Sequence, residues 1–316
     1  MENTVKGRIL KGVGGLYTVC IIDDCSPLCG KSVRCRARGS FRHNHLTPLA
    51  GDFVTLSFDD DNAKNGEDGF VIDEIVDRRS ALIRPPMANL DYLFVTMAVA
   101  SPSPILSTVD KLISIAEHNK IEPVIVITKC ELDPQMAQDI KGIYTKAGLE
   151  CFSLSAKENV GVETIDRFIA EKLPSKTAAF AGASGIGKST LLNRLFPHLE
   201  LSTAQISRKI ERGRHTTREV TLFPLSDSPK CGYIADTPGF SMLDFKRFDF
   251  FEKEDLVDTM REFAPYIGEC KFTKCTHTKE QGCAVIEAVK KGDISLSRHQ
   301  SYVELYEILK TRKKWD

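Results

Sequence analysis

A glycine-rich segment that ends in Lys-Ser is the strongest chemical signal in this sequence. The segment consists of Gly182, Ala183, Ser184, Gly185, Ile186, Gly187, Lys188 and Ser189. Glycines let backbone N–H groups curl around phosphate oxygens, and a helix that starts after such a loop adds its partial positive charge. The lysine of this pattern reaches the β- and γ-phosphates, and the serine hydroxyl binds Mg²⁺. We therefore predict a nucleoside triphosphate site over residues 182–190, with Thr190 included, rather than a glycine-rich turn without a ligand.

A second segment is expected to complete this site. Asp236 ends an apolar stretch, and Gly239 follows three residues later. Beside a phosphate loop, such a segment holds Mg²⁺ through water and bonds to the γ-phosphate. Asp-x-x-Gly alone is usually a turn at the end of a strand, so its position downstream of the phosphate loop carries the prediction.

Two stretches upstream of the phosphate loop have the composition of a guanine-recognition site. They comprise Thr128, Lys129, Cys130 and Glu131, and then Ser155, Ala156 and Lys157. GTPases read guanine with an Asn/Thr-Lys-x-Asp loop and a Ser-Ala-Lys loop, whose carboxylate accepts hydrogen bonds that adenine cannot donate. Glu131 occupies the aspartate position and is one methylene longer, so the geometry must shift. Asp133 is two residues too late to be a simple substitute, and we predict that Glu131 reads the base.

A stretch rich in basic residues, residues 211–220, lies between the phosphate loop and Asp236. A loop here that offers a threonine hydroxyl to Mg²⁺ is the expected switch element, ordered by the γ-phosphate and released after hydrolysis. We choose Thr217 as this ligand and Thr216 as the near alternative. A basic turn without a metal role is the competing interpretation.

The residue that orients the attacking water is not obvious. Phe240 stands where many GTPases have a water-orienting glutamine, and a phenyl ring can neither position water nor transfer a proton. We therefore predict slow intrinsic hydrolysis and choose His215, a neutral imidazole on the switch stretch, as the catalytic candidate. The alternative is a loop histidine that faces RNA.

The order of these segments is unusual. Both base-recognition stretches precede the phosphate loop, which in an ordinary GTPase follows the first strand. The order base, base, phosphate, switch threonine, switch aspartate is that of a circularly permuted GTPase. The original termini would be joined near residues 172–178, which include a short Pro-Ser stretch.

Hydrophobic patterns divide the chain into three regions. Residues 1–80 predict about five short strands in a small barrel of the oligonucleotide-binding (OB) type. After the turn-rich residues 78–91, apolar strands alternate with amphipathic helices to residue 247, which predicts an α/β domain with a parallel sheet. Residues 248–316 predict a helical domain, with helices over residues 252–267, 283–292 and 296–314. The expected fold class is multidomain α/β: an OB-like barrel (1–80), a circularly permuted P-loop GTPase domain (81–247) and a helical zinc-binding domain (248–316).

A metal site is predicted in the last region. Cys270, Cys275, His277 and Cys283 lie within fourteen residues. Three thiolates and one imidazole suit one tetrahedral Zn²⁺ in a closed structural site, without a position for catalytic water. Unrelated buried cysteines are the alternative. A second group is expected to be incidental, with metal as the lesser alternative: Cys20, Cys25, Cys29 and Cys35.

Composition sets limits on partners and location. The chain has 316 residues, 43 basic and 43 acidic, so its net charge predicts no nucleic-acid partner. The charges are unevenly distributed, however. Strand alternation would place Arg34, Arg36 and Arg38 on one face of the barrel. This face either binds RNA or is simply a solvated surface. Lys310, Arg312, Lys313 and Lys314 form a second basic cluster with the same two interpretations. With no long apolar run and no secretory signal, we expect a cytoplasmic protein that does not engage membranes.

The ordered motifs, the barrel and the Cys-Cys-His-Cys group together resemble the RsgA family of small ribosomal subunit biogenesis GTPases. The resemblance covers nearly the whole chain and includes residues 36–42, 50–54, 84–91, 182–193, 213–220 and 236–241. It implies a cytoplasmic factor that binds the small ribosomal subunit and its rRNA late in maturation and hydrolyses GTP to GDP and phosphate. It also implies Mg²⁺ with GTP, one zinc ion, stimulation by the ribosome and a role for His215. We expect a monomer.

Two other classes of protein compete with this interpretation. A P-loop ATPase or small-molecule kinase would not need the paired base-recognition stretches. An RNA-binding protein with a vestigial nucleotide site would have no reason to keep Lys188, Ser189, Thr217 and Asp236 together.

Overall fold

The structure is a computed structural model with two compact units, and each is described by itself. The described residues are 4–39, 41, 46–58, 69–83, 85–199, 220–226, 228, 231–236 and 252–311. The first unit comprises Met1–Tyr92, Arg167–Phe180 and Phe196–Phe240, and the second comprises Leu93–Asp166, Ala181–Leu195 and Ser241–Asp316. The domain boundaries expected near residues 80 and 247 remain predictions.

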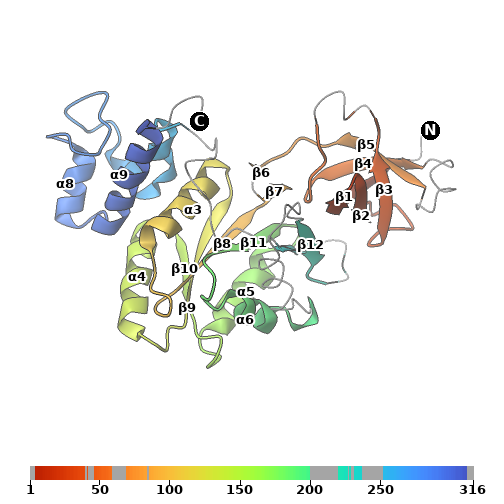
Figure 1. The fold of residues 1–316 in the computed structure, drawn as a ribbon, viewed down its shortest axis with the longest axis horizontal. Coiled ribbons are helices and arrows are strands. Elements are labelled where there is room, and N and C mark those ends of the chain that lie inside the picture. The colour runs from red at the N-terminus through yellow and green to blue at the C-terminus, as the bar shows by residue number, and fades with distance from the viewer. Residues whose placement is uncertain are drawn as a thin grey trace. The chain divides into compact units, whose positions relative to one another are not determined.

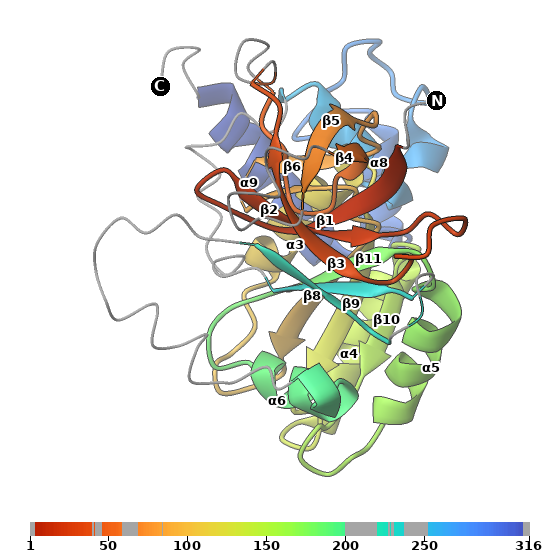
Figure 2. The same ribbon diagram turned by 90° about the vertical axis from the view of Figure 1, so that its right-hand side faces the viewer.

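Five strands of the first unit close into the predicted barrel (Figure 2). They are β1 (Val5–Val13), β2 (Leu16–Ile21), β3 (Ser32–Ala37), β4 (Phe53–Phe58) and β5 (Phe70–Ile75). Their order is β1-β2-β3-β5-β4, and β4 pairs again with β1, which closes the sheet. Buried Val33 and Cys35 alternate with exposed Arg34 and Arg36 along β3, because side chains of a strand point to opposite faces in turn. The sequence correctly placed these arginines on the outer face.

A short ribbon replaces the turns expected at residues 78–91. Strands β6 (Ala81–Ile83) and β7 (Pro86–Ala88) pair antiparallel. The ribbon is held by a close approach to Gly51, where an added Cβ would lie 2.0 Å from the Ala88 carbonyl oxygen. Asn89 Nδ2 also donates to the Gly51 oxygen at 3.0 Å. These are long-range contacts, which local turn propensity does not reveal.

Three more strands belong to the first unit: β11 (Thr177–Ala181), β12 (Thr221–Pro224) and β13 (Tyr233–Asp236). Strand β11 runs parallel to β13, and β12 runs antiparallel to it. Strand β12 also meets the barrel, because Thr221 pairs with Lys11 of β1. The helix α5 (Val162–Lys172) precedes β11, and the short 3-10 helix η1 is Pro197–Leu199.

The second unit contains the predicted alternation of strands and helices. Its strands are β8 (Tyr92–Ala98), β9 (Glu122–Thr128) and β10 (Glu150–Ser153), in the order β10-β9-β8, with β9 and β10 parallel. Its helices are α3 (Leu106–His118), α4 (Pro134–Lys146) and α6 (Lys188–Leu195). Strands β8 and β9 are buried almost throughout, as expected for strands covered on both faces.

The C-terminal part of this unit is helical but differs from the prediction in one stretch. Residues 252–267 form two 3-10 helices, η3 (Asp255–Thr259) and η4 (Arg261–Tyr266), instead of one α-helix. Met260 has a non-helical backbone (φ −111°, ψ 87°) that ends η3, and Pro265 lacks the N–H that an α-helix would need. The predicted helices α8 (Ala284–Lys291) and α9 (Leu296–Thr311) are present, and α9 packs beside α3 (Figure 1).

A buried arginine joins α9 to α3. Arg298 Nη1 donates to Asp110 Oδ1 of α3 at 2.7 Å, and its Nε donates to Glu262 Oε1 of η4 at 2.7 Å. The side chains of Arg298 and Asp110 are each 1% exposed. Burial raises the pKa of Asp110, and the adjacent guanidinium opposes that shift. The contact is therefore a charge cluster that depends on all of its members.

We predict that Arg298→Met lowers the free energy of unfolding by about 3–5 kcal/mol, because two buried carboxylates lose their partner. Urea unfolding followed by circular dichroism measures the change. The matched control is Lys290→Met, which removes an exposed pair with Glu287 and is expected to leave the unfolding midpoint unchanged. Equal stability of the Arg298 variant and the wild type would contradict the prediction.

Candidate nucleotide site and metal centre

The predicted phosphate loop connects β11 to the first turn of α6. Gly182 has φ +147°, and a Cβ there would lie 2.3 Å from the Thr96 carbonyl oxygen, so the loop can approach β8 this closely only with glycine. Ala183, Ser184 and Gly185 are exposed at the tip. Helix α6 begins at Lys188, and the backbone N–H groups of a first helical turn have no partner within the helix. Lys188 Nζ lies 3.4 Å from the Gly182 oxygen, so this lysine folds back along the loop.

Thr128 and Lys129, at the end of β9, hold the other side of this loop. The Thr128 hydroxyl donates to the Ile186 carbonyl oxygen, 58 positions away in sequence. Lys129 Nζ lies 2.8 Å from the Gly185 oxygen and also donates to the Ser101 oxygen. Two of the residues chosen for base recognition therefore brace the segment chosen for phosphate binding.

Glu131 presents an unused acceptor. Its Oε2 is buried and has no hydrogen-bond partner among the residues that the structure describes. A buried carboxylate oxygen without a donor is unfavourable, and a ligand with N–H groups would satisfy it. Asp133 is engaged elsewhere, because its Oδ1 accepts from the Met136 N–H at 2.9 Å and caps α4. Of the two carboxylates, Glu131 is the one with an acceptor atom left over, and its role in base recognition stays a prediction.

The Ser-Ala-Lys stretch follows β10, beside β9. Ser155 is fully buried, its Oγ accepts from the Glu158 N–H at 3.1 Å, and its backbone bonds to Val160. The Cys130 N–H donates to the Leu154 oxygen at 3.3 Å, which links the two base-recognition stretches. Ala156 and Lys157 lie in this turn, and Lys157 is exposed.

Asp236 is the last residue of β13. Ala179 of β11 pairs in parallel with Ala235, so both strands end at the same edge of their sheet, and the phosphate loop continues from β11. Ser189 and Thr190 lie in the first turn of α6. The other chosen residues, His215, Thr216, Thr217 and Gly239, lie outside the described residues. All these roles remain predictions.

The four predicted zinc ligands meet in the second unit. The side-chain ligand atoms of Cys270, Cys275, His277 and Cys283 all lie within 4.8 Å of one another. Cys270 Sγ is 3.8 Å from Cys283 Sγ, and His277 Nδ1 is 3.5 Å and 3.4 Å from those two sulfurs. A tetrahedral zinc ion with ordinary bond lengths requires separations of about 3.8 Å between sulfurs and about 3.5 Å between sulfur and nitrogen. The donor set and its spacing therefore fit Zn²⁺ bound through Nδ1.

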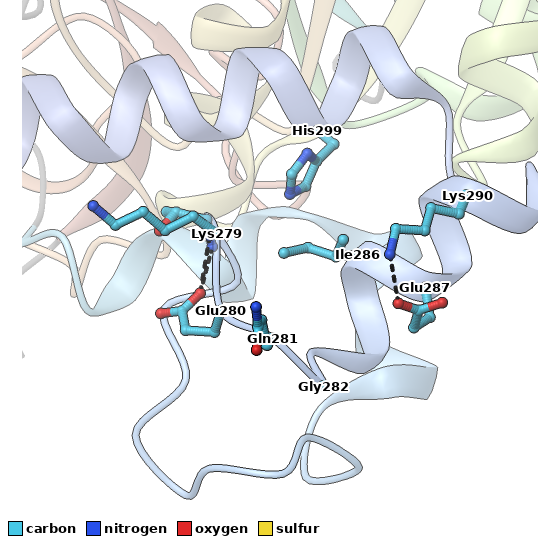
Figure 3. Close-up of a pocket in the computed structure, with 9 residues that line it drawn as sticks. Lys279, Glu280, Gln281, Gly282, Ile286, Glu287, Lys290 and His299 are labelled. Carbon is cyan, nitrogen blue, oxygen red and sulfur yellow. Dashed lines mark hydrogen bonds and ion pairs between the residues drawn. The ribbon is translucent and has the colours of Figure 1, made fainter.

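Hydrogen bonds to Glu280 and His299 hold this Cys/His loop in place, and Figure 3 shows these two residues among those that line a pocket here. The Glu280 carboxylate accepts from the backbone N–H groups of Thr276 at 2.8 Å and Thr278 at 3.0 Å. Burial raises the pKa of Glu280, but hydrogen bonds from the Thr276 hydroxyl and from the backbone N–H groups of Thr276 and Lys279 outweigh it and hold this pKa at about 2. His299 of α9 points toward the loop, with Nε2 2.8 Å from the His277 carbonyl oxygen. Such outer contacts fix the positions of metal ligands.

The cysteines of the barrel form no comparable group in the described part of the chain. Cys35 lies in the barrel core and Cys20 is buried, whereas Cys25 is exposed. The expectation that these cysteines are incidental stays a prediction.

Comparison with known proteins gives the family. The profile described as RsgA GTPase matches residues 75–246, and that described as RsgA N-terminal domain matches residues 6–66. The chain belongs to the RsgA GTPase family. It is accordingly a GTP hydrolase, and its motif order and neighbours give it the circularly permuted GTPase fold.

Relatives of the RsgA family match over nearly the full length. A protein from Alkaliphilus metalliredigens named small ribosomal subunit biogenesis GTPase RsgA is 39% identical, over 98% of this chain and 99% of its own. One of the same name from Ruminiclostridium cellulolyticum is 38% identical over 96% and 93%. The crystal structure of YjeQ from Thermotoga maritima has a TM-score of 0.79 at 29% identity, covering 98% of this chain and 100% of its own. That of YloQ, a circularly permuted GTPase, has a TM-score of 0.75 at 32% identity, covering 98% and 96%.

Membership of the RsgA family explains the motifs but not every contact of the site. The Ser101 carbonyl, which accepts from Lys129, carries no side-chain chemistry and could not be chosen from the sequence. The support from Glu280 and His299 was also missed, because their hydrogen bonds depend on the conformation of the loop, although Glu280 lies between two candidate metal ligands in the sequence. No helix among those described combines the length and apolar character needed to cross a membrane.

We predict that the purified protein contains one zinc ion and that Cys283→Ser lowers its zinc affinity at least about 100-fold, because a thiolate ligand is lost. Metal analysis by mass spectrometry and competition with a chromophoric chelator measure this. The exposed Cys25 supplies the control, and Cys25→Ser is expected to keep the full zinc content. Unchanged zinc affinity in the Cys283 variant would rule out this coordination.

Proposed function

We propose that this chain binds the small ribosomal subunit through its rRNA and hydrolyses GTP to GDP and phosphate during late maturation, with stimulation by the ribosome. The observation that carries the GTP assignment is the bracing of the phosphate loop by Thr128 and Lys129, together with Glu131 Oε2, which has no hydrogen-bond partner among the described residues. The names of the full-length relatives supply the subunit as partner. We place the protein in the cytoplasm as a monomer.

The proposed function assigns a role to each group of site residues. Backbone N–H groups of residues 182–190 and the Lys188 ammonium hold the phosphates, and Glu131 with the Ser155 turn selects the base. Ser189 and Thr217 would bind Mg²⁺, which neutralises charge on the phosphates, while Asp236 and Gly239 complete the γ-phosphate contacts. Cys270, Cys275, His277 and Cys283 would hold a zinc ion, which would stabilise their loop and have no open position for water.

The arginine face of β3 suits the proposed RNA partner. Arg34 and Arg36 are exposed on one side of the strand, and Arg38 follows just after it. Guanidinium groups on a strand face bind phosphates with a strong dependence on salt. This surface supports rRNA rather than a small-molecule substrate.

Glu131→Gln is predicted to weaken GTP binding by about 10- to 100-fold, because an amide N–H then opposes the guanine donors. XTP, whose ring offers a carbonyl at that position, should gain affinity. Asp133→Asn is the matched control, since asparagine also caps helices and GTP affinity should be retained. Fluorescence titration with GTP, ATP and XTP measures all three proteins. If ATP bound as well as GTP to the wild type, the guanine assignment would fail.

Hydrolysis of GTP is predicted to rise at least tenfold when small ribosomal subunits are added, and His215→Ala should remove most of that rise. Phosphate release, with and without subunits, is the measurement. Lys188→Ala is the control for the nucleotide site and should abolish both rates. Stimulated turnover that His215→Ala leaves untouched would reject the role of His215 but not the GTPase function. Absence of any release from the wild type would favour a vestigial nucleotide site.

A further inference from the structure

A buried arginine of the barrel touches three strands at once. The Arg8 side chain, on β1, is 1% exposed. Its guanidinium carbon lies 4.7 Å from the centre of the Phe53 ring and 4.6 Å from that of the Tyr233 ring. Its Nη2 donates to the Thr177 hydroxyl. One cation is therefore placed between two aromatic rings and a hydroxyl group.

The three partners of Arg8 each stand at the start of a strand. Phe53 is the first residue of the barrel strand β4, Thr177 is the first residue of β11, and Tyr233 is the first residue of β13. Along the chain, β11 leads directly into the phosphate loop and β13 ends at Asp236. Arg8 thus joins the barrel to the starts of the two strands that carry nucleotide-binding segments.

Burying the charged Arg8 guanidinium is less favourable than burying an apolar side chain, so packing alone does not explain an arginine at this position. Burial lowers the pKa of Arg8 to about 10, yet the side chain stays charged at neutral pH. Its Nε is buried without a hydrogen-bond partner among the described residues. The Thr177 backbone N–H is bonded to Asp91 Oδ2 at 2.8 Å, which brings a compensating negative charge near the site. An apolar side chain of similar length would pack here without leaving a buried donor unsatisfied.

We propose that Arg8 is a positioning residue that couples RNA binding on the barrel to the nucleotide state, by holding the starts of β11 and β13 against β1 and β4. This inference rests on the proposed function. A displacement of the barrel strands by RNA moves the guanidinium, and the guanidinium acts on both strands together. Because such coupling is reciprocal, the bound nucleotide must change the affinity for RNA by the same factor.

The test compares the affinity for small ribosomal subunits in the presence of a non-hydrolysable GTP analogue and of GDP, measured by sedimentation. The wild type is expected to show at least a fivefold ratio of these affinities. Arg8→Met keeps the length of the side chain but loses the charge and the donor, and its ratio should fall to within twofold of one. Lys6→Met is the control, because Lys6 is exposed on the same strand. It removes one charge from the barrel and should preserve the ratio even if overall affinity declines.

Thr177→Val provides a second variant that keeps the buried shape and removes only the hydroxyl acceptor. It should reduce the ratio at least twofold and remains informative if the Arg8 variant does not fold. Folded Arg8→Met and Thr177→Val proteins with the wild-type ratio would overturn the role of Arg8 while leaving the proposed function intact. A wild type that does not bind subunits with either nucleotide would instead refute the proposed function, and the inference with it.

Discussion

The hydrogen bonds from Thr128 and Lys129 to the phosphate loop are the constraint on which the nucleotide site depends. They connect a strand end that comes early in the chain with a loop that comes much later. A GTPase site requires strand ends to meet at one edge of a sheet. It does not depend on the order of those strands along the chain. Rotating that order preserves the site as long as these bonds are kept. The permuted sequence is therefore compatible with ordinary nucleotide chemistry.

The sequence was most informative where local pattern and chemistry coincide. Buried strands, amphipathic helices and the alternation of Val33, Arg34, Cys35 and Arg36 follow from side-chain periodicity, so their elements could be predicted. The ribbon β6–β7 could not, because Gly51 and Ala88 come together only after the barrel has formed. The two 3-10 helices were missed because helical periodicity alone does not register the break at Met260.

The candidate site could likewise be predicted only in part from the sequence. Spacing selected four candidate metal ligands, which the structure brings together, and two candidate base-recognition stretches, whose role stays a prediction. Spacing could not show that Asp133 is used as a helix cap, which is what leaves Glu131 as the available acceptor. Nor could it show the backbone donors around Glu280 or the carbonyl of Ser101, since these depend on loop conformation.

The charge cluster around Arg298 limits which residues related chains can have at these positions. Asp110 lies on α3, but the group that neutralises it comes from α9, almost two hundred positions later. Either residue is strongly destabilising in the core without the other, so we expect relatives to keep or replace the two together. In lineages that lost the C-terminal helices, the residue at position 110 would be exposed to water, where a carboxylate needs no partner. In such lineages, the face of α3 that α9 covers here should have become polar.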